Sequence, residues 1–530
     1  MNLSAAGTPA KSTTFTRQGI FVLATLILAA GVANLNLAVA NVSLPDIGKD
    51  LGAAQTGLNL VAVGFTLGLA MSVVYLGALG DRFGRRRLLL VGLAVSIPLA
   101  AMAAWAPNIT VLVIARILGG IAAGMVYPTT LTIIVAQFDG KAKTTAIALW
   151  SGLGAGFSAI GPVIVGWLLT FAWWGSGFAI TIPLAAIAFV FALRLPKHSG
   201  ESGDSVDSIS GVLSIVMIAT LVLAITFAPT PGQALFSIIL AVISVLSIWY
   251  FLHRQRRIAR PLFDLTIARR RIFWVAGLAG IIVFGALMGS FFIGQQYLQN
   301  VLEYNTFAAG LAILPSPIAM VLFAPIAALW IPKFGSRITL LIGFATVATG
   351  FIFMMFWTTA ASVWLVSITY FLLGAGVSIA AAPASRSIMA AVPTRLLGMG
   401  SAMNDLQRDL GGAIMQAVMG ALLVVRYAGE MRSAFSGAPA ADQQLLTDQS
   451  VTLMTSSYAG AASVAETLPN TDSTALLQWA SDAFAAGSSW AFGFGLVAVV
   501  GGMVLVAFAF PKKADEETIE AEYARTADAD

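Results

Sequence analysis

Cysteine is absent from this 530-residue chain, and charged residues make up only 10% of it. Soluble domains usually contain about 25% charged residues, so no water-soluble fold could cover the apolar surface of a chain that is 58% hydrophobic. Without cysteines, the sequence does not indicate whether the protein works in an oxidising or a reducing compartment. The pattern G-x-x-x-x-G-K-[ST] is missing too, so nothing in the sequence supports an ATP-driven machine.

Long apolar runs dominate the chain. Each contains roughly 18 to 28 residues, enough to cross a hydrocarbon core about 30 Å thick. Ala38-Val39-Ala40 resembles a signal-peptide cleavage site, but the apolar run around it is longer than the usual ~7 to 15 residues, so we interpret this run as a span. The sequence predicts an all-α polytopic membrane protein with about fourteen spans, at 19–45, 57–79, 88–106, 109–136, 143–171, 175–195, 209–228, 234–252, 273–299, 307–330, 338–357, 362–389, 398–425 and 486–510.

Lysine and arginine are unevenly distributed between the two sides. If the N-terminus is cytoplasmic, 24 of the 29 basic residues lie in inner segments or at inner helix ends. The outer segments then hold only Lys49, Arg426 and Arg432. The remaining two, Arg116 and Arg408, fall inside spans. This asymmetry follows the positive-inside rule. It predicts a multi-pass protein of a bacterial cell membrane, with both termini cytoplasmic.

Two polar inner segments divide the spans into groups. One follows the sixth span, and a strongly basic one, HRQRRIARPLFDLTIARRR, follows the eighth. We interpret the acidic end of the chain as a solvated tail. The expected organisation is a cytoplasmic segment 1–18, a six-helix half 19–195, an inserted helix pair with its basic linker 196–272, a second six-helix half 273–510 that includes an outer loop 427–485, and a cytoplasmic tail 511–530.

The inner loop after span 57–79 carries the most specific motif. Its sequence GALGDRFGRRR, residues 77–87, matches almost position for position the inner-loop signature of the major facilitator superfamily, G-x-L-a-D-R-x-G-R-[KR]. The segment IPKFGSRIT repeats a glycine and basic residues at the same place in the second half, as expected of a transporter built from related halves. The resemblance implies a cytoplasmic gate made of Gly77, Asp81, Arg82, Gly84, Arg85 and Arg86.

Other segments resemble the fourteen-helix drug:proton antiporter branch of that superfamily. They are Arg116-Ile117-Leu118-Gly119-Gly120, QQYLQNVLEYNTFAAGLAILP and PTRLLGMGSAMNDLQRDLGG. The antiporter motif of the fifth helix is partly matched, with Phe157 and Val165 where glycines are common; its matching residues are Gly161, Pro162 and Gly166. The resemblance covers about residues 20–510 and implies the major facilitator fold, two six-helix halves plus two inserted helices, without identifying a substrate.

The first span departs from that branch. Its relatives commonly read L-D-x-T-I-V-N-V-A-L-P, whereas this chain reads LNLAVANVSLP and has Asn36 in place of the acid. An amide does not exchange protons near neutral pH. We expect Asn36 and Arg116 to lie in the central cavity, because a guanidinium in mid-helix is strongly disfavoured against lipid.

Acidic residues within the spans are almost confined to 398–425. Asp405 and Asp409 are the only carboxyl groups well inside a span, and Arg408 lies between them. The spacing of four places both carboxylates on one helix face. One interpretation is a structural ion pair at the inner mouth; the other is that Arg408 neutralises one aspartate while the second exchanges a proton during transport. On the second interpretation we favour Asp409, because it lies deeper.

These features together predict a proton-coupled multidrug or small-molecule exporter that works by alternating access, and not an enzyme. An exporter of anionic or zwitterionic metabolites or lipids, and an uncoupled facilitator, remain as alternatives. We expect a monomer whose partners are a small-molecule substrate, protons and membrane lipids, with no nucleic acid, cofactor, metal site or catalytic residue. The aromatic candidates for the cavity wall, with packing as the alternative role, are Tyr127, Trp150, Phe157, Phe291, Phe292 and Tyr297.

Overall fold

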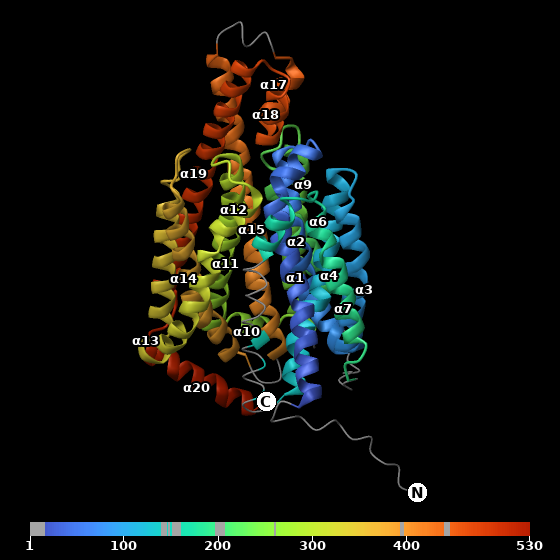
Figure 1. Cartoon of the computed structure of the whole chain (residues 1–530). Helices are drawn as coiled ribbons and strands as arrows, with labels where there is room; N and C mark the ends of the chain where they lie inside the picture. The colour runs from blue at the N-terminus through green and yellow to red at the C-terminus, as the bar shows by residue number, and fades with distance from the viewer. Residues whose placement is uncertain are drawn as a thin grey trace.

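The computed structural model is an all-helical bundle (Figure 1). It describes residues 16–138, 142, 146, 149–150, 161–196, 207–258, 261–392, 397–438 and 446–529. Within these ranges, eleven helices are long and apolar enough to cross a membrane. The predicted all-α polytopic fold is therefore confirmed. The expected span 143–171 lies mostly outside the described ranges, although residues 161–168 are helical.

The first group of helices runs from residue 17 to residue 192. Asn108 caps one of them by accepting a hydrogen bond from the backbone N–H of Val111, at 2.9 Å. Two helices, α2 and α4, cross closely at Gly68 and Gly120, where a Cβ would lie 2.1 Å from a backbone oxygen of the other helix. The helices of this group are α1 (Arg17–Asp50), α2 (Gln55–Phe83), α3 (Arg85–Ala104), α4 (Ile109–Gln137), α6 (Ser176–Ala179) and α7 (Thr181–Ala192).

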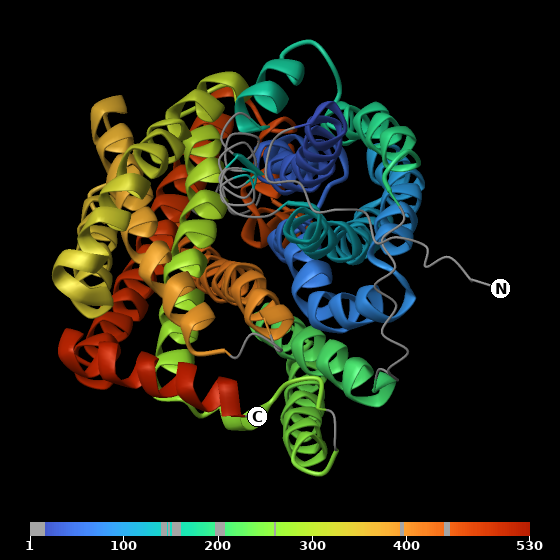
Figure 2. The same ribbon diagram turned by 90° about the horizontal axis from the view of Figure 1, so that it is seen from below.

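Helices α8 (Ser208–Phe227) and α9 (Ala234–Gln255) form a hairpin beside the two larger groups (Figure 2). Arg254 binds Asp207 with both side-chain oxygens of the aspartate, at 2.9 and 3.0 Å. These hydrogen bonds hold the pKa of the Asp207 carboxyl at about 2, so the pair stays charged at neutral pH. Helix α8 packs against α2 and against α15 (Leu397–Gly437), and α9 leaves an apolar face exposed, as suits contact with lipid.

The second group of helices runs from residue 271 to residue 509. Beyond one end of the bundle, α17 (Asp448–Ser456) packs against α15, and α18 (Tyr458–Ala465) packs against α19 (Asn470–Ala509) (Figure 1). We call this the outer end, following the predicted orientation, and the opposite end the inner end. The main helices of the group are α11 (Arg271–Asn300), α12 (Thr306–Ile313), α13 (Pro315–Met354), α14 (Val363–Ala390), α15 and α19 (Asn470–Ala509); α10 (Leu265–Ala268) precedes them.

The two inner turns that share a sequence pattern also share a backbone conformation. Gly84 ends α2 with φ of 99°, and Gly335 interrupts α13 with φ of 82°; glycine adopts such angles most readily. Two residues after each glycine, an arginine donates to carbonyl oxygens where the last helix of its own group ends. Arg86 binds the end of α7, and Arg337 binds the end of α19. The sequence repeat is thus a repeat of structure.

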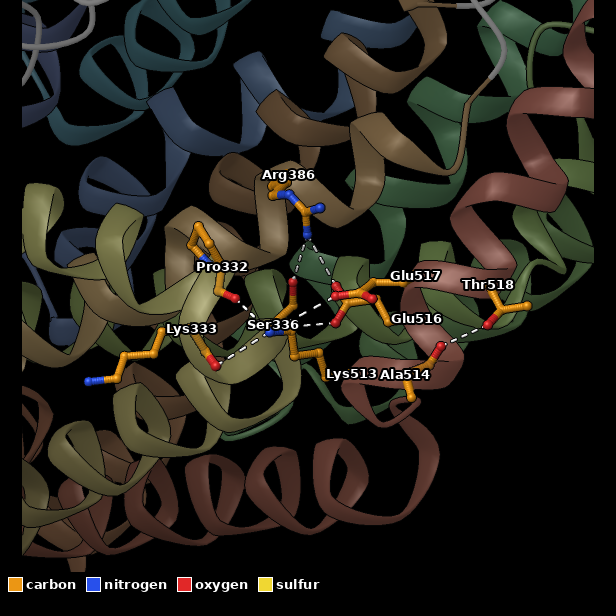
Figure 3. A network of polar contacts seen from close by, with 9 residues as sticks. All are labelled: Pro332, Lys333, Ser336, Arg386, Lys513, Ala514, Glu516, Glu517 and Thr518. Atoms are coloured by element: carbon orange, nitrogen blue, oxygen red, sulfur yellow. Dashed lines mark hydrogen bonds and ion pairs between the residues drawn. The ribbon is translucent and has the colours of Figure 1, made fainter.

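The chain ends in α20 (Lys513–Ala529), which lies across the inner end of the second group (Figures 1 and 3). Glu516 is only 3% exposed. One of its oxygens lies 3.2 Å from an Arg386 nitrogen, and the other accepts the backbone N–H of Ser336 at 3.1 Å. The expectation of a solvated tail is therefore wrong at Glu516, because this carboxylate binds the positively charged end of a helix and a guanidinium.

Glu516→Ala should release α20 from the bundle, because Arg386 and the Ser336 N–H lose their shared acceptor. Trypsin should then cut after Lys512 or Lys513 about 5- to 10-fold faster than in the parent protein, as expected from the loss of charge-assisted hydrogen bonds. Glu517→Ala is the matched control, since the Glu517 side chain is 68% exposed. Equal cleavage rates in the two variants would show that Glu516 does not anchor the helix.

Candidate transport site

A cavity of about 280 Å³ lies where the two helix groups face each other. Three of the six aromatic candidates, Tyr127, Trp150 and Phe291, line it. Phe292 and Tyr297 are fully buried in the core instead, and Phe157 lies outside the described residues. The lining residues are Asn34, Tyr127, Leu131, Trp150, Phe284, Leu287, Met288, Phe291, Ile313, Pro317, Met320, Ser385, Asn404, Asp405, Gln407 and Arg408.

Arg408 is held in place from both sides of this cavity. Its Nε donates to Asp409 Oδ1 at 3.1 Å, and its Nη1 donates to the Tyr127 hydroxyl at 2.7 Å. The guanidinium carbon also lies 4.3 Å from the centre of the Tyr127 ring, in the geometry of a cation–π contact. Asp409 is 2% exposed. The ion pair therefore neutralises both charges within α15, and Tyr127 connects it to α4.

Asp405 lines the same cavity and is 8% exposed. It makes no hydrogen bond or ion pair with the residues that the structure describes. Our choice of Asp409 as the proton-exchanging group rested on its depth alone. The geometry pairs Arg408 with Asp409 and leaves Asp405 without an ion pair, while which of the two carboxyl groups exchanges a proton stays a prediction.

Arg116 and Asn36 lie inside the first helix group. Arg116 is 2% exposed and donates to the backbone oxygens of Val61, at 3.2 Å, and Asn36, at 2.8 Å. Its guanidinium carbon lies 4.8 Å from the ring centre of Phe65 and 5.5 Å from that of Phe178. Both Arg116 and Asn36 line a separate cavity of about 30 Å³. Their expected place in the central cavity is not what the structure shows, because carbonyl oxygens and aromatic faces solvate the guanidinium within the group.

The arginines of the gate motif make contacts within the first group, and none of the described lining residues of the cavity belongs to the motif. Arg85 donates to the backbone oxygen of Thr132 at 3.4 Å, Arg86 binds the end of α7, and Arg82 lies over the Phe83 ring at 4.9 Å. A Cβ on Gly77 would have no atom within 4 Å. The side chain of Asp81 lies outside the described part of the chain.

The two groups meet tightly at the outer end. Gly166, from the antiporter motif, lies so close to the start of α12 that a Cβ there would be 2.4 Å from the Thr306 carbonyl oxygen, and Thr306 Oγ1 donates to the Gly166 oxygen at 3.1 Å. A Cβ on Gly310 would lie 2.7 Å from the Pro162 oxygen; Gly161 and Pro162 are themselves buried. The motif residues thus form a contact between the two groups.

Polar side chains complete this outer contact. Gln55 donates to Gln296 at 2.9 Å, and Gln299 donates to the Val42 oxygen at 3.0 Å. Beyond them, Lys49 and Glu466 form an exposed ion pair at 2.8 Å between α1 and the residue that follows α18. The outer end is therefore closed by several weak contacts.

Sequence reasoning missed the uncharged polar residues of the site. Asn34 lines the cavity on α1, and Asn41 lies seven residues away on the same helix face. Gln295 is fully buried on α11. The available signal was an amide side chain within an otherwise apolar and uncharged run, repeated at helical spacing in the case of Asn34 and Asn41.

Comparison with known proteins identifies the family. Residues 26–416 match the family described as Major Facilitator Superfamily. The chain belongs to the Major Facilitator Superfamily. It is 30% identical to the multidrug efflux pump LfrA of Mycolicibacterium smegmatis over 92% of this chain and 95% of that protein. It is 27% identical to the methyl viologen resistance protein SmvA of Salmonella typhimurium, over 88% and 93% of the two chains.

Solved structures support the same fold. A bacterial homologue of the human lysosomal transporter Spinster, in an inward-facing and unoccupied conformation, aligns with a TM-score of 0.65 at 13% identity, over 94% of this chain and 98% of that one. A POT family transporter in complex with 5-aminolevulinic acid aligns with a TM-score of 0.63 at 14% identity, over 92% and 96%. This member of the Major Facilitator Superfamily is thus a multi-pass membrane transporter of small molecules and not an enzyme, as the sequence predicted.

The different surroundings of the two aspartates predict opposite effects on stability. Asp409→Asn leaves the partly buried Arg408 without its counter-charge and should destabilise the protein, by about 1 to 3 kcal/mol. Asp405→Asn removes a buried charge that has no fixed partner, so it should leave stability unchanged or raise it. Thermal unfolding of both variants in detergent measures the difference. If Asp405→Asn is the more destabilising change, Asp405 and not Asp409 is the partner of Arg408.

Proposed function

We propose that this transporter exports amphiphilic small molecules, drugs among them, by alternating access, and that proton exchange at Asp405 drives the export. A relative named as a multidrug efflux pump supports the direction, and a second relative, named as a multidrug resistance protein, supports the substrate class. The observation that carries the proposal is a largely apolar, partly aromatic cavity whose described lining contains a single carboxyl group, Asp405, while the nearby Arg408 forms its ion pair with Asp409.

The chemistry of this carboxyl group explains the coupling. An ionised Asp405 has to be compensated in its buried position, and either a cationic group of the substrate or a proton can do so. The two therefore compete for one site. A proton arriving from the outer side displaces the bound cation there, and loss of that proton toward the cytoplasm restores the site for the next substrate.

The remaining machinery acts on the two ends of the cavity. The contacts of Gly166, Gln296 and Gln299 close the outer end, and the arginine turn of 82–86 acts on the inner end. We place the protein in the cell membrane as a monomer, with both termini cytoplasmic, and the basic inner loops face anionic lipid headgroups.

Cation binding should release a proton if the two compete at Asp405. In a weakly buffered detergent solution, adding an aromatic ammonium compound to the parent protein should release up to about one proton per bound cation, because binding and protonation are linked. Asp405→Asn should bind the compound more weakly and release none.

Ser385→Ala is the matched control, since Ser385 lines the same cavity and carries no charge. It should release protons like the parent. Cation binding without proton release in the parent, or release that persists in Asp405→Asn, contradicts the proposal and points to an uncoupled facilitator or to another coupling group.

An anionic substrate is the second candidate, and one observation favours it. Arg408 lines the cavity, and its Nη2 has no hydrogen-bond partner among the described residues. An exporter of anions would bind them through this nitrogen, would lose binding in Arg408→Gln, and would keep it in Asp405→Asn. The same binding assay, with anionic compounds added, separates the two candidates.

A further inference from the structure

A second chamber adjoins the central cavity. It has a volume of about 70 Å³ and shares four lining residues with that cavity, namely Asn34, Met288, Phe291 and Ile313. Along α15, Gln416 lies eleven residues beyond Asp405, a rise of on the order of 16 Å toward the outer end. The chamber therefore extends the cavity toward the outer contacts.

Neutral polar groups distinguish this chamber from the central cavity. None of its described lining residues is charged. Its polar side chains beyond Asn34 come from four different segments of the chain, namely Asn41, Thr66, Gln295 and Gln416. We call it the amide chamber.

Gln295 is the unusual member of this set. Its side chain is 0% exposed, and neither its amide nitrogen nor its oxygen has a hydrogen-bond partner in the described part of the chain. The carbonyl oxygen of Asn41 is likewise unpaired. A buried polar group left in this state costs free energy. The adjacent Gln296, by contrast, bonds to Gln55 and to the Phe292 oxygen.

We propose that the amide chamber is a second substrate subsite, which binds a neutral carbonyl, hydroxyl or carboxamide group of the transported compound. A glutamine amide has an NH₂ group that donates hydrogen bonds and an oxygen that accepts them. It can therefore bind a substrate group that accepts, donates or does both. A second cation is disfavoured there, because no carboxylate lines the chamber to compensate it. This inference rests on the proposed function, in which Asp405 binds the cationic end.

The two subsites together define the shape of the substrate. A compound that reaches both has a cationic group at one end, a neutral hydrogen-bonding group at the other, and an apolar or aromatic body between them. Phe291 and Met288 line both spaces and contact that body. Such a compound is elongated, with a length on the order of 16 Å.

The test compares two phenylalkyl-trimethylammonium compounds of equal length. They differ only on the phenyl ring, where one carries a carboxamide and the other an isopropyl group of similar shape. Equilibrium binding to the purified full chain should favour the carboxamide by about 3- to 10-fold, the effect expected of a neutral hydrogen bond in a buried site.

Gln295→Leu and, independently, Asn41→Leu should abolish this preference by weakening carboxamide binding and leaving isopropyl binding unchanged or stronger. Leu37→Met is the control, since it alters the chamber wall without removing a hydrogen bond, and it should keep the preference. Equal loss for both compounds in both variants, or no preference in the parent, overturns the subsite while leaving cation binding at Asp405 intact. If neither compound binds the parent, the proposed cation site fails as well.

Discussion

Two opposite charges on neighbouring residues of α15 determine what the centre of this protein can do. Asp409 is buried and Arg408 is partly buried beside it, and the charge of Asp409 would be strongly disfavoured there alone. Their pairing leaves Asp405 as the other buried carboxyl group, which lines the cavity, and in the proposed function its charge depends on what enters the cavity. The Tyr127 hydroxyl and ring extend the pair to α4. Both residues of the ion pair thus lie in the second helix group, while Tyr127 of the first group helps to hold the Arg408 side chain in position.

Polarity changes along the cavity from the inner to the outer end. The charged side chains of Asp405 and Arg408 line the central cavity, whereas the described lining of the amide chamber beyond it is uncharged. Charged groups at the outer end would need compensation each time the helix groups separate. Neutral amides exchange one hydrogen-bond partner for another, or for water, at much lower cost. This gradient suits a site that has to open there.

The sequence predicted the fold, the family and the two matching turns, because long apolar runs and a glycine followed by basic residues express local constraints. It could not predict the partner of Arg408, since Asp405 at i−3 and Asp409 at i+1 are both within reach of a long side chain. Arg116 was misplaced because its partners, the oxygens of Val61 and Asn36, lie on other helices. The contact of Glu516 cannot be predicted from its own segment, because the loop that it binds lies 180 residues earlier in the chain.

That loop shows how the two halves have diverged. Asp81 stands three residues before Gly84, whereas Pro332 stands three residues before Gly335, so the second half has no acid at this point of its turn. Glu516 brings a carboxylate to the same turn from α20, where it accepts the Ser336 N–H and pairs with Arg386. A carboxylate within the loop moves with it, whereas one on a separate helix can detach. The inner end of the second half is therefore held by a contact between separate elements, in which Glu516 of α20 binds residues of α13 and α14.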